Sequence, residues 1–382
     1  MFTRPDDLPE NAIAGALQDL WGFRAASLEY QAVGFGSHHW LATDTTGRLL
    51  FTTADDLAAK RRTANDTTDA ALDRLSAAFG TALALRTQVG LTFVIAPLPT
   101  TSRQVVARLS DRYSLVVHPY VIGKQAGKDG QFTSDVDRRT VLDMIIQIHC
   151  ARVGKPRADD FVVPDLDALQ NMMRKKGGAW RSGPYAQPAQ ELLHAYLSDL
   201  RLLVRAYHSL ARRVSSRPER MVPTHGEPNA NNVIVTNDGL VLVDWETTLL
   251  APPERDLWDL AGHDRSLLNR YAAATGIEID EDALTLYRLW YDLAEIGGYL
   301  SWFHDAHEDT ADTSESWKNL QHFLRPAERW PILCHRPHGI HGAAVHQVKS
   351  MPQTSQADNP IRCASPNDRQ RRCPARSARQ EW

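Results

Sequence analysis

The chain has 382 residues, of which 43% are hydrophobic and 23% charged, so it can bury more than one core, and two lobes or domains are expected. Its formal net charge of −3 argues against a nucleic-acid-binding protein of the usual basic kind. It has no run of roughly 18 apolar residues, and its N-terminus lacks the basic-then-apolar order of a secretory signal, so we expect a cytoplasmic protein with neither a nucleic-acid nor a membrane partner.

The first third of the chain alternates short apolar stretches with helical periods. This pattern predicts a small lobe of mixed strands and helices over residues 1–117. The predicted helices lie at residues 11–21 and 67–87, and the predicted strands at residues 28–33, 48–53, 93–97 and 115–120.

A glycine-rich segment, Gly34-Phe35-Gly36-Ser37, follows the first predicted strand. Glycine adopts backbone conformations that other residues avoid, and successive N–H groups in such a loop can approach a phosphate closely. A plain turn has the same composition. The segment alone therefore leaves both interpretations open.

The rest of the chain predicts a mostly helical lobe over residues 118–330, followed by a tail. The apolar residues of this lobe recur at helical spacing, which predicts helices at residues 134–152, 166–176, 190–214 and 284–303. Residues 331–382 hold eight Lys or Arg against three Asp or Glu and no sustained apolar period. Such a segment cannot bury enough surface to offset chain entropy, so we expect a disordered basic tail.

The most informative part of the sequence is His225-Gly226-Glu227-Pro228-Asn229-Ala230-Asn231-Asn232, with Asp244 twelve residues after Asn232. The intervening residues form two apolar runs around a polar turn, which predicts a β-hairpin. A hairpin brings its open ends together, so Asn232 and Asp244 should lie side by side. Their oxygens suit Mg²⁺, and Glu227 could accept a proton nearby.

These residues resemble the aminoglycoside phosphotransferase family, the small-molecule branch of the protein-kinase-like superfamily. The family's motif runs His-Gly-Asp, four variable residues and Asn, followed by a strand pair that ends in a metal-binding Asp. The resemblance covers roughly residues 20–325. It implies catalytic roles for Glu227, Asn232 and Asp244, with Asn232 and Asp244 also as metal ligands, and supporting roles for His225 and Asp256.

The resemblance also implies an α+β, protein-kinase-like two-lobed fold, with Mg²⁺ and with ATP or GTP as the phosphate donor. The acceptor would be a hydroxyl of a small molecule, and a cationic one would suit, because aminoglycosides are polycations. A hinge near residues 116–123 would meet the purine. The residues implied for the nucleotide are Gly34, Gly36, Ser37, Thr53, Val117 and Tyr120. The acidic residues implied for the acceptor are Asp292, Glu295, Asp305 and Glu308.

Two positions depart from the family pattern. Glu227 replaces the expected Asp, which keeps the carboxylate but lengthens its arm. The small-lobe Lys that usually holds the phosphates is missing, since its position falls at Thr52 or Thr53, and a hydroxyl supplies no charge. The next predicted helix offers no Glu to pair with a Lys. The substitutes that the sequence offers are Lys60, Arg61 and Arg62.

Three alternatives to an antibiotic kinase remain open from the sequence. A kinase of a metabolite alcohol, such as a sugar, homoserine or a choline-like compound, would use the same residues. A nucleotide-binding pseudokinase is favoured by the missing Lys and disfavoured by the presence of both Asn232 and Asp244. A helical interaction protein would not explain the hairpin.

Overall fold

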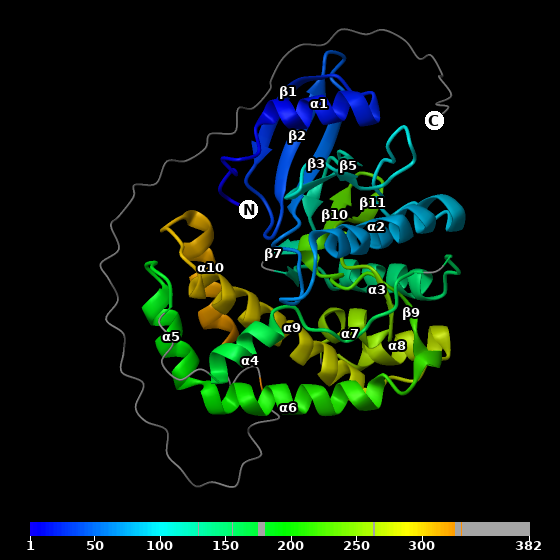
Figure 1. Ribbon diagram of the computed structural model, residues 1–382. Coiled ribbons are helices and arrows are strands. Elements are labelled where there is room, and N and C mark those ends of the chain that lie inside the picture. Colours follow the sequence, from blue (N-terminus) through cyan, green and yellow to red (C-terminus); the bar gives the residue numbers. More distant parts are fainter. Residues whose placement is uncertain (129, 155, 175–179, 263, 325–329, 331–382) are drawn as a thin grey trace. The chain divides into compact units, whose positions relative to one another are not determined.

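The computed structural model describes residues 1–330 apart from 129, 155, 175–179, 263 and 325–329 (Figure 1). The predicted tail, residues 331–382, lies outside the described residues. The described residues all belong to one compact unit of the chain. The predicted division into lobes at residue 117 therefore stays a prediction.

A five-stranded antiparallel sheet forms the centre of the N-terminal part, with strand order β1-β2-β3-β5-β4. Short turns connect β1 to β2, β2 to β3 and β4 to β5; in the turn between β2 and β3, Gly47 has a φ of +86°. Helix α2 lies between β3 and its neighbour β5 in the sequence. The strands are β1 Ala25–Gln31, β2 His38–Asp44, β3 Leu49–Asp56, β4 Ala107–Arg108 and β5 Tyr113–Pro119.

Helices cover the two faces of this sheet. Helix α1, Glu10–Trp21, packs in a core cluster with Val117 of β5. Helix α2, Thr68–Ala84, packs in a second cluster with Val116 and continues as a π-helical turn at Leu85–Val89. Because side chains alternate along a strand, consecutive residues of β5 contribute to different cores.

The C-terminal part is mostly helical, and helix α9 lies at its centre, in contact with α4, α5, α6, α7 and α10. Helix α9 is therefore apolar on most of its circumference. In the described part of the chain, no helix is long and apolar enough to cross a membrane. The helices are α3 Asp135–His149, α4 Leu166–Arg174, α5 Ala186–Ala195, α6 Leu197–Val214, α7 Glu254–Leu260, α8 Arg265–Thr275, α9 Glu281–His304 and α10 Ala311–Phe323.

Short strands complete the fold. The predicted hairpin is confirmed as β10, Val233–Thr236, paired antiparallel with β11, Gly239–Leu242. Strand β6 joins β10 on its other edge. The remaining short strands are β6 Lys124–Gln125, β7 Gly127–Lys128, β8 Gln131–Phe132, β9 Val222–Thr224 and β12 Leu249–Ala251, with β7 paired to β8 and β9 to β12.

Two predicted elements differ in the structure. The predicted strand at residues 93–97 forms only an isolated bridge from Val94 to Leu242, because its neighbour is the end of the hairpin and not another long strand. The predicted helix at residues 190–214 is two helices, α5 and α6. They meet at Tyr196, whose backbone angles (φ −103°, ψ 12°) are not helical.

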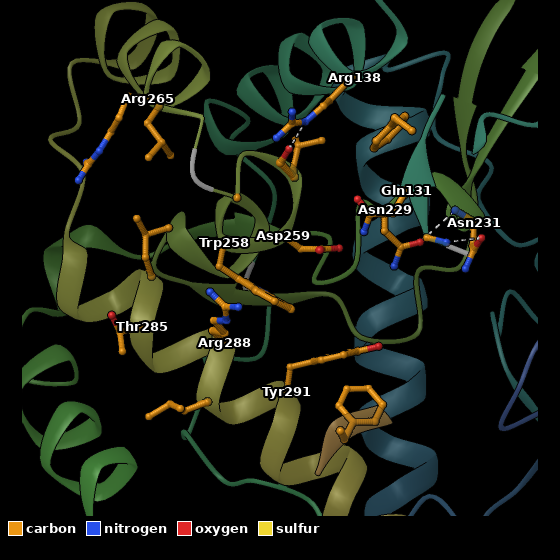
Figure 2. Close-up of a pocket in the computed structure, with 18 of the residues that line it drawn as sticks. Gln131, Arg138, Asn229, Asn231, Trp258, Asp259, Arg265, Thr285, Arg288 and Tyr291 are labelled. Atoms are coloured by element: carbon orange, nitrogen blue, oxygen red, sulfur yellow. Dashed lines mark hydrogen bonds between the residues drawn. The ribbon is translucent and has the colours of Figure 1, made fainter. Parts of the chain in front are cut away.

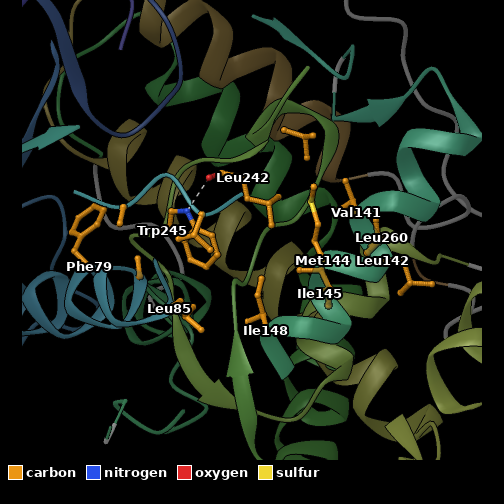
Figure 3. Close-up of a cluster of buried hydrophobic side chains, with 14 of the residues drawn as sticks. Phe79, Leu85, Val141, Leu142, Met144, Ile145, Ile148, Leu242, Trp245 and Leu260 are labelled. Carbon is orange, nitrogen blue, oxygen red and sulfur yellow. Dashed lines mark hydrogen bonds between the residues drawn. The ribbon is translucent and has the colours of Figure 1, made fainter. Parts of the chain in front are cut away.

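One buried cluster joins α2, α3 and the end of the hairpin (Figure 3). Trp245, directly after Asp244, is fully buried in it with Phe79 of α2 and Ile145 of α3. The indole Nε1 of Trp245 donates a hydrogen bond of 3.0 Å to the carbonyl of Leu242. The position of the Asp244 backbone is thus set by core packing.

Removing a side chain from this cluster should destabilise the protein. We expect Ile145→Ala, at a residue with no exposed surface, to cost about 2–5 kcal/mol, because it loses buried contacts and leaves a cavity. Val136→Ala, on the same helix at a residue that is 63% exposed, should change stability little. The measurement is the free energy of unfolding in urea. Equal effects of the two substitutions would contradict this assignment of the core.

Candidate active site

The open end of the hairpin brings Asn232 and Asp244 side by side. Val233 pairs with Leu242, and the amide of Val243 donates a 3.0 Å hydrogen bond to the carbonyl of Asn232. The side-chain Nδ2 of Asn232 donates to the carbonyl of Glu227 at 2.9 Å, which orients the amide. The amide Oδ1 is therefore the atom of Asn232 that remains for a cation.

Asp244 has an unusual backbone and an unusual environment. Its φ is +65°, in the left-handed region, which costs a residue with a side chain roughly 1–2 kcal/mol. Burial, with the neighbouring charge of Glu246, raises the pKa of Asp244 to about 7, although the Lys60 ammonium opposes this. Strain and unfavourable burial of this kind mark functional positions.

Asp256, at the start of α7, holds the backbone of the loop formed by residues 225–232. It is fully buried, and it accepts hydrogen bonds from the backbone amides of His225 (2.9 Å) and Gly226 (2.6 Å). Nε2 of His149 donates to the same carboxylate at 3.0 Å. Burial alone would raise the pKa of Asp256, but the hydrogen bond from His149 and the nearby positive groups lower it below its ordinary value.

His225 links this loop to the segment that carries Asp244. Its Nδ1 accepts a hydrogen bond from the amide of Glu227 at 3.2 Å, so its Nε2 carries the proton and donates to the carbonyl of Val243 at 2.9 Å. Burial lowers the pKa of His225 to about 4, which keeps the ring neutral. One imidazole thus fixes the distance between the backbones that carry Glu227 and Asp244.

Glu227 faces other carboxylates. Burial raises its pKa to about 8, and the charges of Asp244, Glu295 and Glu246 contribute in the same direction. Glu295 belongs to α9, so Glu227 lies between the end of the hairpin and the central helix. A carboxylate with a raised pKa in such a place can exchange a proton with a bound hydroxyl.

Lys60 is the cation that the structure brings to these carboxylates. Its Nζ lies 2.6 Å from Glu246 and 3.3 Å from Asp55 of β3, and it donates to the hydroxyl of Ser37 at 3.2 Å. Burial would lower the pKa of Lys60, but Glu246 and Asp55 raise it above its ordinary value. The ammonium therefore stays charged between the glycine-rich loop and the end of the hairpin.

The other two candidates for this position have different partners. Arg62 binds the carboxylate of Asp160 with two hydrogen bonds, of 2.8 and 2.7 Å. Arg61 is exposed and donates to the carbonyl of Ala58. Of the three substitutes that the sequence offered, only Lys60 reaches the site.

The glycine-rich loop, residues 34–37, lies over Lys60. Gly34 and Gly36 have φ values of +68° and +92°, which glycine adopts without strain. The hydroxyl of Ser37 donates to Asp55 at 2.6 Å. At the tip, the ring of Phe35 lies 6.1 Å from the rings of both Tyr299 and Trp302 on α9.

Three residues predicted to contact the nucleotide have different surroundings. Thr53 is buried, and its hydroxyl lies 3.1 Å from Nδ1 of His39. The side chain of Val117 is fully buried against α1, and its carbonyl accepts a hydrogen bond from the amide of Leu98, so the predicted contact of Val117 with the base is not supported. Tyr120 follows β5 and is 41% exposed.

The four acidic residues predicted to contact the acceptor do not lie together in the structure. Asp292 is fully buried and accepts a 3.0 Å hydrogen bond from Nε1 of Trp330, which argues against a substrate contact. Asp305 and Glu308 are exposed beyond the end of α9, where Asp305 lies 3.8 Å from Arg181. The charge of Glu295 contributes to the raised pKa of Glu227.

Asn232 and Asp244 fit a metal that is shared with a substrate. Among the described residues, no group of three or more His, Cys, Asp or Glu side chains could hold a metal ion. Mg²⁺ does not need such a cage, because it commonly binds through one or two protein oxygens together with substrate phosphates. One carboxylate, one amide oxygen and an adjacent phosphate-binding loop match that requirement.

A cavity of about 790 Å³ borders the 225–232 loop (Figure 2). Asn229 and Asn231 of the loop line it, together with Trp258 of α7 and with Arg288 and Tyr291 of α9. Neither this cavity nor the pairing of Lys60 with Asp55 and Glu246 was predicted from the sequence. The position of Glu246 two residues after Asp244 was the available signal, since two residues of chain can span at most about 7 Å.

Comparisons with known proteins agree on the fold. Residues 38–299 match the phosphotransferase enzyme family (APH). Protein StrN of Streptomyces griseus is 31% identical over 253 residues, which are 63% of this chain and 74% of that protein.

Two solved structures are similar over most of their length. Spectinomycin phosphotransferase, APH(9)-Ia, in complex with ADP and spectinomycin has a TM-score of 0.62 at 15% identity, covering 85% of this chain and 97% of its own. A microcompartment-associated aminopropanol kinase has a TM-score of 0.52 at 16% identity, covering 85% and 98%. The predicted α+β, protein-kinase-like fold is thereby confirmed. The chain belongs to the phosphotransferase enzyme family, as its resemblance to aminoglycoside phosphotransferases predicted, and is a small-molecule kinase.

Proposed function

We propose that this kinase transfers the γ-phosphoryl group of ATP or GTP, with Mg²⁺, to a hydroxyl of a small, amino-bearing molecule in the cytoplasm. The observation that carries the proposal is the convergence of Lys60 with Glu246 beside Asp244, under the glycine-rich loop. An ammonium at that place can bind phosphate oxygens, and the carboxylate beside it can share a cation with the same phosphates.

The residues of the site would have separate roles in the transfer. Glu227 would accept the proton of the acceptor hydroxyl. The hydroxyl oxygen bonds to the γ-phosphorus while the bond from that phosphorus to the β,γ-bridging oxygen breaks, and the nucleoside diphosphate leaves. Asn232 and Asp244 would hold the Mg²⁺ ion, which when bound neutralises charge on the phosphates. Lys60 and the amides of the glycine-rich loop would bind the phosphates from the other side.

An amino group on the acceptor is supported by Glu295, a partly buried carboxylate close to Glu227. Opposite charges within a few ångströms orient a ligand strongly when water is partly excluded. Aminoglycoside-type antibiotics and metabolite amino alcohols both satisfy this condition. The alternative is therefore a metabolite kinase, which uses the same catalytic residues.

Nucleotide binding tests the metal assignment. We expect Mg²⁺ to strengthen the binding of ATP or GTP to the wild type, and we expect Asp244→Asn to lose this dependence, because an amide cannot supply the anionic ligand. Asn also tolerates the positive φ of this position. The measurement is calorimetric titration with and without Mg²⁺. Asp238→Asn, in the exposed turn of the same hairpin, is the matched control. The proposal fails if neither nucleotide binds, or if Asp244→Asn responds to Mg²⁺ as the wild type does.

The role of Lys60 is tested by removing its charge. We expect Lys60→Met to weaken nucleotide binding by about 10- to 100-fold, because charge-assisted hydrogen bonds to the phosphates are lost. Lys60→Arg should recover part of the affinity. Arg61→Met, which removes the neighbouring exposed cation, should bind nucleotide normally. Wild-type affinity in Lys60→Met would exclude a phosphate contact.

The role of Glu227 is tested by turnover. We expect Glu227→Gln to lower kcat by about 10²- to 10⁴-fold, since an amide cannot accept the proton, and to leave nucleotide binding intact. Glu227→Asp keeps the carboxylate and should retain more activity. The measurement is nucleoside diphosphate release with a panel of amino alcohols and aminoglycosides. An unchanged kcat in Glu227→Gln would rule out the general base.

A further inference from the structure

The cavity beside the 225–232 loop is not an acidic pocket. Its described lining residues include three arginines and three acidic residues, and the others are mostly leucine, aromatic and amide side chains. A site built for a polycation would carry an excess of carboxylates. The charged residues that line the cavity are Arg138, Arg265, Arg288, Asp135, Asp259 and Glu281.

The three arginines differ in their partners. Arg138 donates hydrogen bonds of 2.6 Å to the carbonyls of Leu260 and Ala261. Arg265 forms an ion pair with Glu281. The guanidinium of Arg288 makes no hydrogen bond or ion pair with any residue in the described part of the chain. It is partly buried, and Figure 2 shows it beside Trp258.

A partly buried cation without a protein partner is unfavourable, and an anionic ligand would relieve it. Guanidinium groups bind carboxylates and phosphates through two parallel hydrogen bonds, which also fixes the orientation of the ligand. Thr285, one turn before Arg288 on α9, also lines the cavity and adds a hydroxyl. The Arg288 end of the cavity therefore has the chemistry of an anion subsite.

The same face of α9 leads from Arg288 to the catalytic base. Tyr291 and Glu295 follow Arg288 at i+3 and i+7, so all three lie on one side of the helix. Arg288 and Glu295 are separated by seven helical steps, which is about 10 Å at 1.5 Å per residue. Tyr291 lines the cavity, and so do Asn229 and Asn231, which belong to the same loop as Glu227. The cavity therefore borders the segment that carries the base.

We propose that this cavity holds the acceptor, and that the acceptor carries an anionic group, a carboxylate or a phosphate ester, which Arg288 binds at the end away from the reacting hydroxyl. The inference rests on the proposed function. With Glu295 close to Glu227, the acceptor is zwitterionic: its amino group lies toward the base and its anion toward Arg288. Arg288 is then the residue that selects this class of acceptor over amino alcohols that lack an anionic group and over polycations.

The test compares acceptors that differ only in the anion. Homoserine is paired with aminopropanol for the carboxylate, and glucosamine phosphate with glucosamine for the phosphate ester. Binding to the full-length protein is measured by calorimetry with saturating ADP and Mg²⁺, so that anions cannot enter the nucleotide site. We expect the anionic member of at least one pair to bind about 10- to 100-fold more tightly.

Matched variants decide whether Arg288 is responsible. Arg288→Gln should abolish the difference within the pair, and Arg288→Lys should restore part of it. Arg265→Gln, which removes a cavity arginine that already has a partner, should keep the difference. An unfolding midpoint measured for each variant shows that it is folded.

Several results would overturn the inference: equal binding within both pairs, a difference that survives in Arg288→Gln, an equal loss in Arg265→Gln, or no binding of either anionic compound. The binding of Mg²⁺ with ATP or GTP is measured separately. If nucleotide binds and the anion has no effect, only this inference fails. If no nucleotide binds, the proposed function fails with it.

Discussion

The structure depends on holding several carboxylates close together around one ammonium group. Glu227, Asp244 and Glu246 repel one another, and burial removes the water that would screen them, so the pKa values of Glu227 and Asp244 are raised to about 8 and about 7. Lys60 neutralises part of this charge through Glu246 and Asp55. The fold must supply the remaining stabilisation from elsewhere. A phosphate-bound cation would remove the same repulsion, so the unfavourable charge in the free protein favours the binding of the reactants.

Packing and hydrogen bonds around these carboxylates supply that stabilisation. Trp245 anchors the strained backbone of Asp244 in the hydrophobic core, and the neutral ring of His225 ties it to the loop of Glu227. In the proposed function, Lys60 takes the place of the usual strand lysine. In protein kinases that lysine pairs with a glutamate of the small-lobe helix, whereas Lys60 pairs with Glu246, which follows the hairpin. The absence of a glutamate from α2 therefore removes nothing from the site, because the ion pair joins different elements.

Local patterns in the sequence predicted much of this fold. The hairpin, most helices and the meeting of Asn232 with Asp244 follow from apolar periods and turn residues that lie within a few positions of one another. Features set by distant contacts could not be predicted in this way. The face of the sheet toward which Val117 points depends on strand register. The ion pair of Lys60 joins residues that are 186 positions apart in the sequence, so no local pattern reveals it. The lack of a partner for Arg288 among the described residues could not be predicted either, because a charged side chain on a helix is usually solvated.

Helix α9 connects the parts of the site because one rigid element contacts all of them. Its C-terminal half meets the tip of the glycine-rich loop through Tyr299 and Trp302. Its middle carries Glu295, whose charge contributes to the raised pKa of Glu227, and its N-terminal half carries Arg288, which lines the cavity. An α-helix has a fixed rise per residue. The distance between the glycine-rich loop and the far end of the cavity is therefore set by residue spacing along α9. An acceptor of the wrong length would then place its hydroxyl away from the phosphorus, and such a displacement is costly because phosphoryl transfer depends on alignment more than on proton removal. If the cavity holds the acceptor as proposed, the position of α9 in the core limits the length of that acceptor, even before any single contact to it is considered.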